Sequence, residues 1–419
     1  MTAVDAAGPR ARPGALGGYE DWPAYMSRHH HRADSDARQE LADALGVPGV
    51  PADLGSPPNV EYTVHWEKKH DGVITSFLSW QLGFGPRTSA WFVRPAGATG
   101  PLPALLALHC HGGIKYYGAE RLVALPDESG GTGAVMPPLE ERARLYGGRA
   151  LATWLAQQGF AVLAHDAFMW GSRRFRLDPL PWRTAGVMNG QEALWRQAGV
   201  EPSAPERYDA AAAAHEETAA KAAALVGSSV AGTVAHDDLA ALSVLAALPG
   251  VDAGRLGCLG FSGGGGRALV LAALSPLIRS YVVTCMMTTF ASLLPAYLDA
   301  HSWLLHSPGL TRLGDWPDLA KRSEARVLVQ YALDDPLFPE QGMRDAHAYL
   351  SGQSPTGQLL TGHLPAGQSP SGQYTGSFWQ EPHVFTPAMQ EEAAAFLASA
   401  LQPRHPINPP VPDRTRTDS

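Results

Sequence analysis

The sequence predicts an α/β protein in which a mostly parallel central sheet carries helices on both faces. Short, nearly continuous apolar runs occur at residues 105–109 (LLALH), 160–164 (FAVLA) and 281–285 (YVVTC), and such runs are typical of strands buried on both faces. A helix-compatible segment at residues 147–158 separates the first two runs, and strand–helix–strand alternation implies right-handed parallel crossovers. The 419 residues are 45% hydrophobic and 17% charged, which suits a globular chain with a sizeable core.

The two ends of the chain are predicted to lie outside this core. Residues 1–18 are rich in Gly, Ala and Pro and are expected to be disordered, and a helical arm at 19–45 and a proline-rich linker are expected to follow, up to residue 58. The globular domain is placed at residues 59–402, and the proline-rich tail at 403–419 is expected to be disordered. Three consecutive histidines at 29–31 do not predict a metal site, because neighbouring side chains on a helix point in different directions.

The elements of the domain follow one another in a regular order. Three stretches with β-branched and aromatic alternation between residues 60 and 93 (VEYTVHW, VITSFLSWQL and TSAWFV) predict an antiparallel opening to the sheet. Further helices are expected at 206–225, 234–248 and 342–350, a strand at 326–333, and a final helix with Thr386 as its N-cap. A short polar near-duplication at 352–376 leaves the last strand without a predicted place.

Two excursions interrupt this order, at about residues 167–227 and 286–316. Both are rich in aromatic or methionine side chains, and we interpret them as insertions that form a lid and a pocket wall. The candidate substrate contacts are Phe168, Trp170, Met286 and Phe290. The alternative is that these side chains fill a satellite core beneath the loops.

The stretch around Ser262 carries the clearest functional motif. It reads Gly260-Phe261-Ser262-Gly263-Gly264, preceded by an apolar run and followed by a helix-compatible segment. A strained turn from strand to helix crowds the positions two before and two after the serine, so both must be glycine. Such a turn exposes the serine hydroxyl and directs backbone N–H groups at incoming negative charge. We therefore interpret Ser262 as a catalytic nucleophile.

A nucleophilic serine needs a base to take its proton and a third group to orient that base. The strand at 326–333 ends in Asp334-Asp335, which is the expected place for an acid following the serine in the chain; Asp335 is favoured, with Asp334 as the alternate. His383 stands on the loop before the final helix and is the candidate base. The other histidines after the acid fall in a predicted helix, the expanded loop or the tail: His347, His363 and His405.

An acyl-transfer enzyme also needs donors for the oxyanion. Gly263, directly after the nucleophile, is expected to supply one backbone N–H. The second is expected from the loop after the strand at 105–109, with Gly113 favoured and Gly112 close behind, because glycines there let the backbone approach a substrate. The histidines and cysteine of this loop do not suggest a metal site, since adjacent strand residues point to opposite faces.

Several of these motifs resemble those of a known family. LALHCHGG, AHDAFMWGSR, VDAGRLGCLGFSGGGG, YALDDPLFP and EPHVFTPAMQ are similar to segments of the α/β-hydrolases, in particular the branch of dienelactone hydrolases and acetyl xylan esterase-like proteins. The resemblance covers roughly residues 60–401. It implies a triad acid four residues before a proline, as Asp335 stands before Pro339. The chain departs from true dienelactone hydrolases in carrying a serine where they carry a cysteine.

The predicted activity is hydrolysis of a small carboxylic ester through an acyl-enzyme, with no cofactor and no metal. The net charge of −8 disfavours binding to nucleic acid or to an anionic membrane. Three cysteines (Cys110, Cys258 and Cys285) lie in or at the ends of predicted buried strands and are interpreted as core thiols, and with no signal-peptide pattern a cytoplasmic location is expected. Alternatives are a prolyl-oligopeptidase-type peptidase, an acyl transferase or cyclase, and a non-catalytic binding module. The acyl and alcohol parts of the substrate stay open, as does the oligomeric state, with a homo-oligomer as one option.

Overall fold

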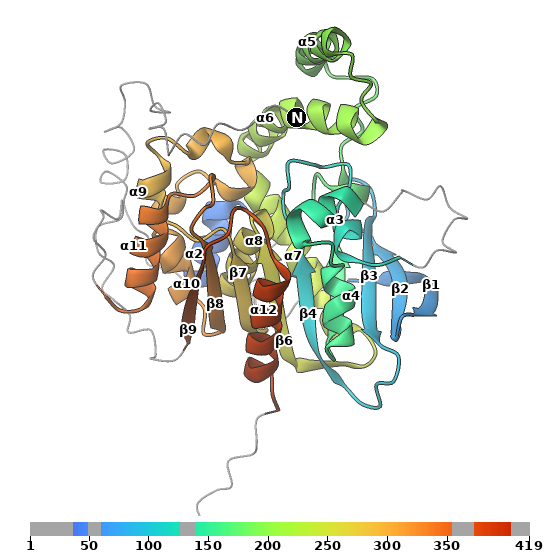
Figure 1. Ribbon diagram of the computed structural model, residues 1–419, viewed down its shortest axis with the longest axis vertical. Coiled ribbons are helices and arrows are strands. Elements are labelled where there is room, and N and C mark those ends of the chain that lie inside the picture. The colour runs from blue at the N-terminus through green and yellow to red at the C-terminus, as the bar shows by residue number, and fades with distance from the viewer. Residues whose placement is uncertain (1–36, 49–59, 126–138, 354–372, 404–419) are drawn as a thin grey trace, which may run out of the picture.

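The computed structural model describes residues 37–48, 60–125, 139–353 and 373–403 (Figure 1). One nine-stranded sheet runs through it in the order β1-β2-β3-β5-β4-β6-β7-β8-β9. The strands are β1 (Tyr62–His70), β2 (Val73–Trp80), β3 (Thr88–Pro95), β4 (Leu102–Leu108), β5 (Ala161–His165), β6 (Val251–Phe261), β7 (Ile278–Thr284), β8 (Arg326–Ala332) and β9 (Tyr374–Trp379). The pairings from β1 to β5 are antiparallel, and the five from β5 through β4 to β9 are parallel. The predicted fold class and its antiparallel opening are therefore confirmed.

Helices cover both faces of this sheet. They are α2 (Ala37–Leu45), α3 (Leu139–Tyr146), α4 (Leu151–Gln157), α5 (Trp182–Ala198), α6 (Ala204–Leu225), α7 (Val230–Ala247), α8 (Gly263–Leu274), α9 (Phe290–Leu293), α10 (Trp316–Lys321), α11 (Glu340–Leu350) and α12 (Pro387–Ala400). Buried side chains of α2, α7, α8, α10 and α11 share one core cluster with the sheet, and those of α3, α4 and α12 share another. Two apolar layers thus enclose the sheet, one on each side.

The central strand β4 shows why its sequence has no polar alternation. Its side chains point to opposite faces in turn, so Leu106 and Leu108 enter the first cluster while Leu105 and Ala107 enter the second. Full burial of each such leucine contributes about 1.5–3 kcal/mol to folding. The β4 strand also pairs with β6, and this pairing places the loop after β4 beside the Ser262 turn.

The most apolar long helix of the described chain is α7. Among the described residues it alone has the length and mean hydropathy that a membrane span would need, yet 78% of it is buried inside the protein. It begins at Val230 rather than at the predicted residue 234, because Ser229 caps it by accepting a hydrogen bond from the amide of Gly232 at 2.9 Å. We conclude that α7 is a core helix.

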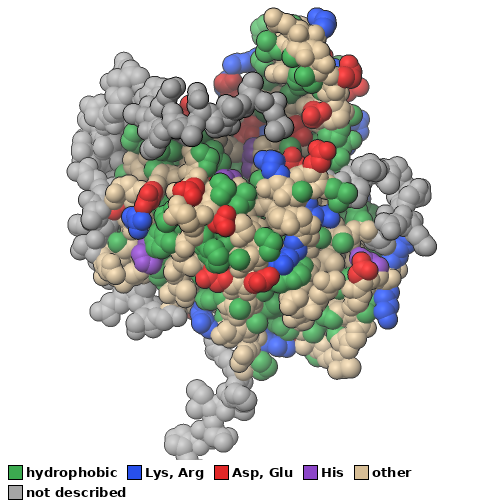
Figure 2. Space-filling view, in the orientation of Figure 1, with side chains coloured by type: hydrophobic (Ala, Val, Ile, Leu, Met, Phe, Trp, Pro, Cys, Tyr) green, Lys and Arg blue, Asp and Glu red, His purple; other side chains and the backbone are tan. Residues whose placement is uncertain are grey.

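The first excursion is mainly helical. Helix α5 was not predicted, and α6 begins two residues before the expected start, at a capping box formed by Ser203 and Glu206. The lobe of α5 and α6 stands at the top of the molecule, clear of the sheet (Figures 1 and 2). Apolar side chains lie on its surface, and Trp182 is 94% exposed. The sheet therefore places few constraints on α5.

Several expectations fall on residues that the structure does not describe. The predicted arm is represented only by α2, and residues 1–36 and 404–419 lie outside the described chain, as do 354–372 within the near-duplication. The last strand, which had no predicted place, is β9, paired with β8 in parallel. Cys110, Cys258 and Cys285 are buried free thiols, which confirms their interpretation as core residues.

Candidate active site

Ser262 occupies a sharp turn between β6 and α8. Its backbone lies at φ +57° and ψ −125°, a conformation that a residue with a side chain adopts only under strain. A Cβ atom on Gly260 would lie 2.1 Å from the carbonyl carbon of Gly264, and one on Gly264 would lie 2.2 Å from the carbonyl oxygen of Leu108. The crowding that the glycine spacing predicts is therefore confirmed, and it explains why both positions lack a side chain.

The side chains of Ser262, His383 and Asp335 form one hydrogen-bonded chain. Ser262 Oγ lies 2.8 Å from Nε2 of His383, and Nδ1 of His383 lies 2.5 Å from Oδ2 of Asp335. The other oxygen of Asp335 accepts a hydrogen bond from the amide of Leu337 at 2.8 Å. Asp334 is exposed and accepts from Gln380 instead, at 2.6 Å. The structure thus brings the favoured acid, and not its alternate, to the histidine.

These three residues reach one another because each follows a parallel strand at the same edge of the sheet. Ser262 directly follows β6, Asp335 follows β8, and His383 stands between β9 and α12. The carboxyl ends of parallel strands in α/β sheets are the usual place for such sites. The chain order serine, acid, histidine is also the predicted one.

The loop after β4 lies beside the serine turn, and its contacts distinguish the amides predicted as the second oxyanion donor from that of His111. The amide of Gly113 donates to Nδ1 of His111 at 3.0 Å, and Gly113 is exposed. The backbone nitrogen of His111 instead lies 3.1 Å from the point where a Cβ of Gly263 would stand. Gly112 and Gly113 have positive φ values of +68° and +73°. The His111 amide therefore lies beside Gly263, whereas the Gly113 amide is engaged within its own loop.

The rings of Phe338 and His301 lie beside His383. The ring of Phe338 stacks on His383 with 6.0 Å between centroids and contacts the ring of His301 at 4.6 Å. His301 Nε2 lies 2.9 Å from the carbonyl oxygen of Leu337, and burial lowers the pKa of His301, so its neutral ring donates that hydrogen bond. Phe338 lies in the predicted YALDDPLFP motif, but no spacing in the sequence points to His301, which stands in the second excursion.

A buried carboxylate on α6 joins both excursions to the β4 loop. Glu216 forms an ion pair with the ammonium of Lys115, and it accepts hydrogen bonds from Ser302 Oγ at 2.5 Å and from the amide of Trp303 at 2.9 Å. Burial alone would raise its pKa, but the Lys115 ammonium and the His111 ring, 3.6 Å away, hold the pKa of Glu216 below its usual range. The α6 helix is thereby fixed to the β4 loop and the second excursion, and no motif in the sequence indicates this contact.

The four predicted substrate contacts do not form one pocket at the serine. Trp170 and Met286 are only 1% and 2% exposed and pack in core clusters, so neither presents a surface to a substrate. Phe168 helps to line a separate cavity of about 810 Å³ between α2 and α6, and Phe290 packs on Trp316. The alternative interpretation, a satellite core, fits Trp170 and Phe168, which pack in a small cluster, whereas Met286 and Phe290 pack in the main core. Leu304 lies closer to the nucleophile, with one methyl group 2.9 Å from the Cβ position of Gly263.

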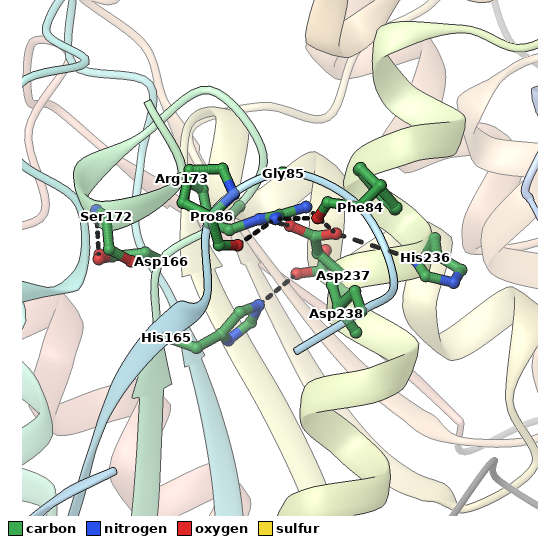
Figure 3. Close-up of polar contacts among 12 residues, drawn as sticks. Phe84, Gly85, Pro86, His165, Asp166, Ser172, Arg173, His236, Asp237 and Asp238 are labelled. Atoms are coloured by element: carbon green, nitrogen blue, oxygen red, sulfur yellow. Dashed lines mark hydrogen bonds and ion pairs between the residues drawn. The ribbon is translucent and has the colours of Figure 1, made fainter. Parts of the chain in front are cut away.

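Two adjacent carboxylates of α7 hold a buried ion-pair network behind the site. Arg173 donates to Asp237 and to the carbonyl oxygens of Phe84 and Pro86, as Figure 3 shows. The neighbouring Asp238 accepts from Arg267 of the serine helix at 2.6 Å and from His165 at 3.0 Å. Breaking a buried pair by removing one partner typically costs about 3–5 kcal/mol. The network therefore fixes α7 to the serine helix α8, to the end of β5 and to the loop before β3.

Two further buried carboxyl groups, those of Glu120 and Asp166, interact unfavourably with each other. Each accepts a backbone hydrogen bond, from the amides of Gly118 at 2.7 Å and Ala119 at 2.8 Å respectively. Burial raises the pKa of Glu120 to about 8, and the Asp166 carboxylate adds to this shift. At neutral pH the folded protein therefore keeps a proton on Glu120 that the unfolded chain releases.

This pair predicts a pH dependence of stability. The pKa of Glu120 in the folded protein lies above its ordinary value of 4.5. The contribution of this group to the free energy of unfolding is therefore fully present below pH 4.5 and is lost as the pH rises towards 8. For this one group the free energy of unfolding is expected to fall by about 1.4 kcal/mol per pH unit in that interval. Glu120→Gln, which keeps the acceptor oxygen, should remove this part of the slope in urea titrations between pH 5 and 8. Equal slopes for the variant and the original protein would contradict the assignment.

Comparisons with known proteins agree with this geometry at the level of the fold. The mostly parallel sheet with helices on both faces has the α/β-hydrolase fold of the structural neighbours. The chain is similar to a proposed acetyl xylan esterase from Bacteroides fragilis (TM-score 0.56, 15% identity, 87% of this chain and 82% of that one). It is also similar to a glucuronoyl esterase from Solibacter usitatus (TM-score 0.53, 15% identity, 87% and 92%).

A sequence relative points in the same direction. The proposed hydrolase YtaP from Bacillus subtilis is 24% identical over 289 residues, which are 68% of this chain and 78% of that protein. No family model matches the chain.

Proposed function

We propose that the protein is a serine hydrolase that cleaves a small carboxylic ester through an acyl-enzyme. The observation that carries this proposal is the hydrogen-bonded chain from Ser262 through His383 to Asp335, with atom separations of 2.8 and 2.5 Å. The hydrogen bond to Asp335 keeps the proton on Nδ1 of His383, so that Nε2 is free to accept the serine proton. The names of the structural neighbours, which describe esterases, support the same class of substrate.

The mechanism follows from these contacts. Ser262 Oγ attacks the acyl carbon while His383 Nε2 takes its proton, and the carbonyl oxygen becomes an oxyanion. The amides of Gly263 and His111 donate to this oxyanion; the first amides of a helix such as α8 have no partner within the helix. His383 then returns the proton to the leaving alcohol. Water repeats the sequence on the acyl-enzyme and releases the acid. No metal or cofactor enters any step.

A panel of p-nitrophenyl esters of increasing acyl length, with matched p-nitroanilides, tests the reaction class. We expect turnover of esters, much slower turnover of the anilides, and stoichiometric labelling of Ser262 by a fluorophosphonate. Comparable rates on anilides would favour a peptidase. Acyl products formed mainly with an added alcohol, rather than with water, would favour a transferase. A folded protein that neither turns over esters nor reacts with the fluorophosphonate would overturn the proposal.

A further inference from the structure

The guanidinium of Arg121 is buried and is bound by backbone carbonyl oxygens. Arg121 lies in the short 3₁₀ helix Ala119–Leu122 and is 0% exposed. No ion pair of its guanidinium is found among the described residues, although burying a charge without a partner is costly. Its donors are instead satisfied by backbone carbonyl oxygens, chiefly those of Cys110 at 3.2 Å, Tyr117 at 2.6 Å and Gly118 at 3.0 Å. Arg121 therefore determines the path of the loop after β4.

One of these carbonyl groups belongs to the peptide unit that lies beside Gly263, the residue after Ser262. The carbonyl oxygen of Cys110 accepts from Arg121 Nη1 and also from Nδ1 of His109, at 3.0 Å. The other end of the same peptide unit is the N–H of His111, the amide beside Gly263. In a planar trans peptide the C=O and N–H bonds point in opposite directions. Holding the carbonyl oxygen at Arg121 therefore directs the N–H away from Arg121, as an oxyanion donor requires.

The His109 ring and the preceding peptide unit both restrict rotation of the Cys110–His111 peptide. Burial lowers the pKa of His109 well below its usual value, so the ring is neutral; Nε2 of that ring accepts from the amide of Ala167 at 3.4 Å, which leaves the proton on Nδ1. The preceding peptide unit is held at both ends, its carbonyl oxygen by Arg267 at 3.1 Å and its N–H by the Tyr146 hydroxyl at 3.3 Å. Rotation of the Cys110–His111 peptide would put a carbonyl oxygen where the oxyanion forms.

We propose that Arg121 is a positioning residue that holds the Cys110–His111 peptide in the orientation that donates to the oxyanion. The inference rests on the proposed function. It explains why a guanidinium with no carboxylate partner is buried next to the site: its planar fork of donors matches several carbonyl oxygens at once. A lysine in its place keeps the charge but cannot reach the same set of acceptors. Arg121 does not touch the substrate, and its effect passes through the backbone.

The chain offers a matched control in Arg142. This arginine is also buried, at 6% exposure, and also donates to backbone carbonyl oxygens: those of Arg121 at 3.1 Å, Glu120 at 3.1 Å and Val123 at 2.8 Å. Its guanidinium donates to carbonyl groups of residues 120–123, and among the described residues it makes no hydrogen bond to residues 110–111. A loss of general packing would affect Arg142→Lys and Arg121→Lys alike, whereas a loss of the oxyanion donor would affect only the second.

The experiment measures kcat, KM, thermal stability and the inhibition constant of a trifluoromethyl ketone for both variants. Removal of one oxyanion donor typically lowers kcat by about 10²–10³-fold. We expect Arg121→Lys to approach this loss with KM changed less than about threefold, and the ketone, whose adduct carries an oxyanion, to bind more weakly by a similar factor. Arg142→Lys should keep kcat within about threefold even if it melts earlier.

Two results would overturn the inference: a kcat for Arg121→Lys close to that of the original protein, or an equal loss in Arg142→Lys. If Arg121→Lys does not fold, Tyr146→Phe replaces it, since it frees the N–H of the neighbouring peptide unit; it should lower kcat by about fivefold or more without a matching change in KM. An unchanged kcat in that variant would also count against the inference. A failure of the proposed function would look different, because the original protein would then show no serine-dependent turnover for any variant to lose.

Discussion

Replacement of Ser262 by alanine is expected to lower ester turnover by a factor of about 10⁴–10⁶, because it removes the only nucleophile of the proposed mechanism. The remaining acceleration over water should come from the oxyanion amides and from binding. The variant should fold normally. Alanine adds no atoms to the turn, and the strained φ of +57° at this position is already borne by a residue with a Cβ.

Steady-state kinetics on a p-nitrophenyl ester, with circular dichroism and a thermal melt of the same preparation, would check this. Ser275 is a suitable control, since it is a buried serine at the other end of α8. Ser275→Ala should keep turnover within about threefold. Substantial hydrolysis by Ser262→Ala, with the fold intact, would exclude the acyl-enzyme mechanism.

Asp335→Asn is expected to lower kcat by about 10⁴-fold, whereas Asp334→Asn should leave it within about threefold. The two residues are adjacent and differ in what they touch. Asp335 accepts from Nδ1 of His383 at 2.5 Å, while Asp334 is exposed and bonded to Gln380. An asparagine at 335 can present its NH₂ group to Nδ1, which favours the wrong tautomer of the histidine and leaves no lone pair on Nε2 for the serine proton.

Asp334→Asn is therefore the control for Asp335→Asn. The comparison needs only the kcat values and melting temperatures of the two variants. A large loss in Asp334→Asn with a small loss in Asp335→Asn would reverse the assignment. Equal losses in both would indicate that the turn after β8, rather than the hydrogen bond to His383, is what the substitutions disturb.

The positions of Ser262, Asp335 and His383 could be predicted because each depends on local sequence at the end of an element. Glycine spacing marks the serine turn, and Asp335 follows shortly after β8, a strand whose residues are buried except for the half-buried Arg326. The orientation of the second amide could not be predicted in this way. It depends on the path of the loop after β4, in which the Gly113 amide donates to the His111 ring and the His111 nitrogen lies beside Gly263.

Other features escaped prediction because sequence alone does not distinguish environments. The residue type does not show whether an arginine such as Arg121 is buried, and most arginines are exposed. Aromatic side chains such as Trp170 suit a core as well as a pocket. Helix α5 carries glycines and exposes apolar side chains, so it shows little of the periodicity that marks a helix packed on a sheet. Strand β9 follows a polar repeat and is only partly buried.

The distance along the chain between the members of the site determines when a newly made molecule can first act. His383 stands 121 residues beyond Ser262, and the loop with the oxyanion amide precedes both. Since synthesis runs from the N-terminus, the nucleophile and its donors exist on the ribosome well before the base does. The proposed mechanism therefore requires that β9 and the loop before α12 join the sheet before Ser262 can be activated.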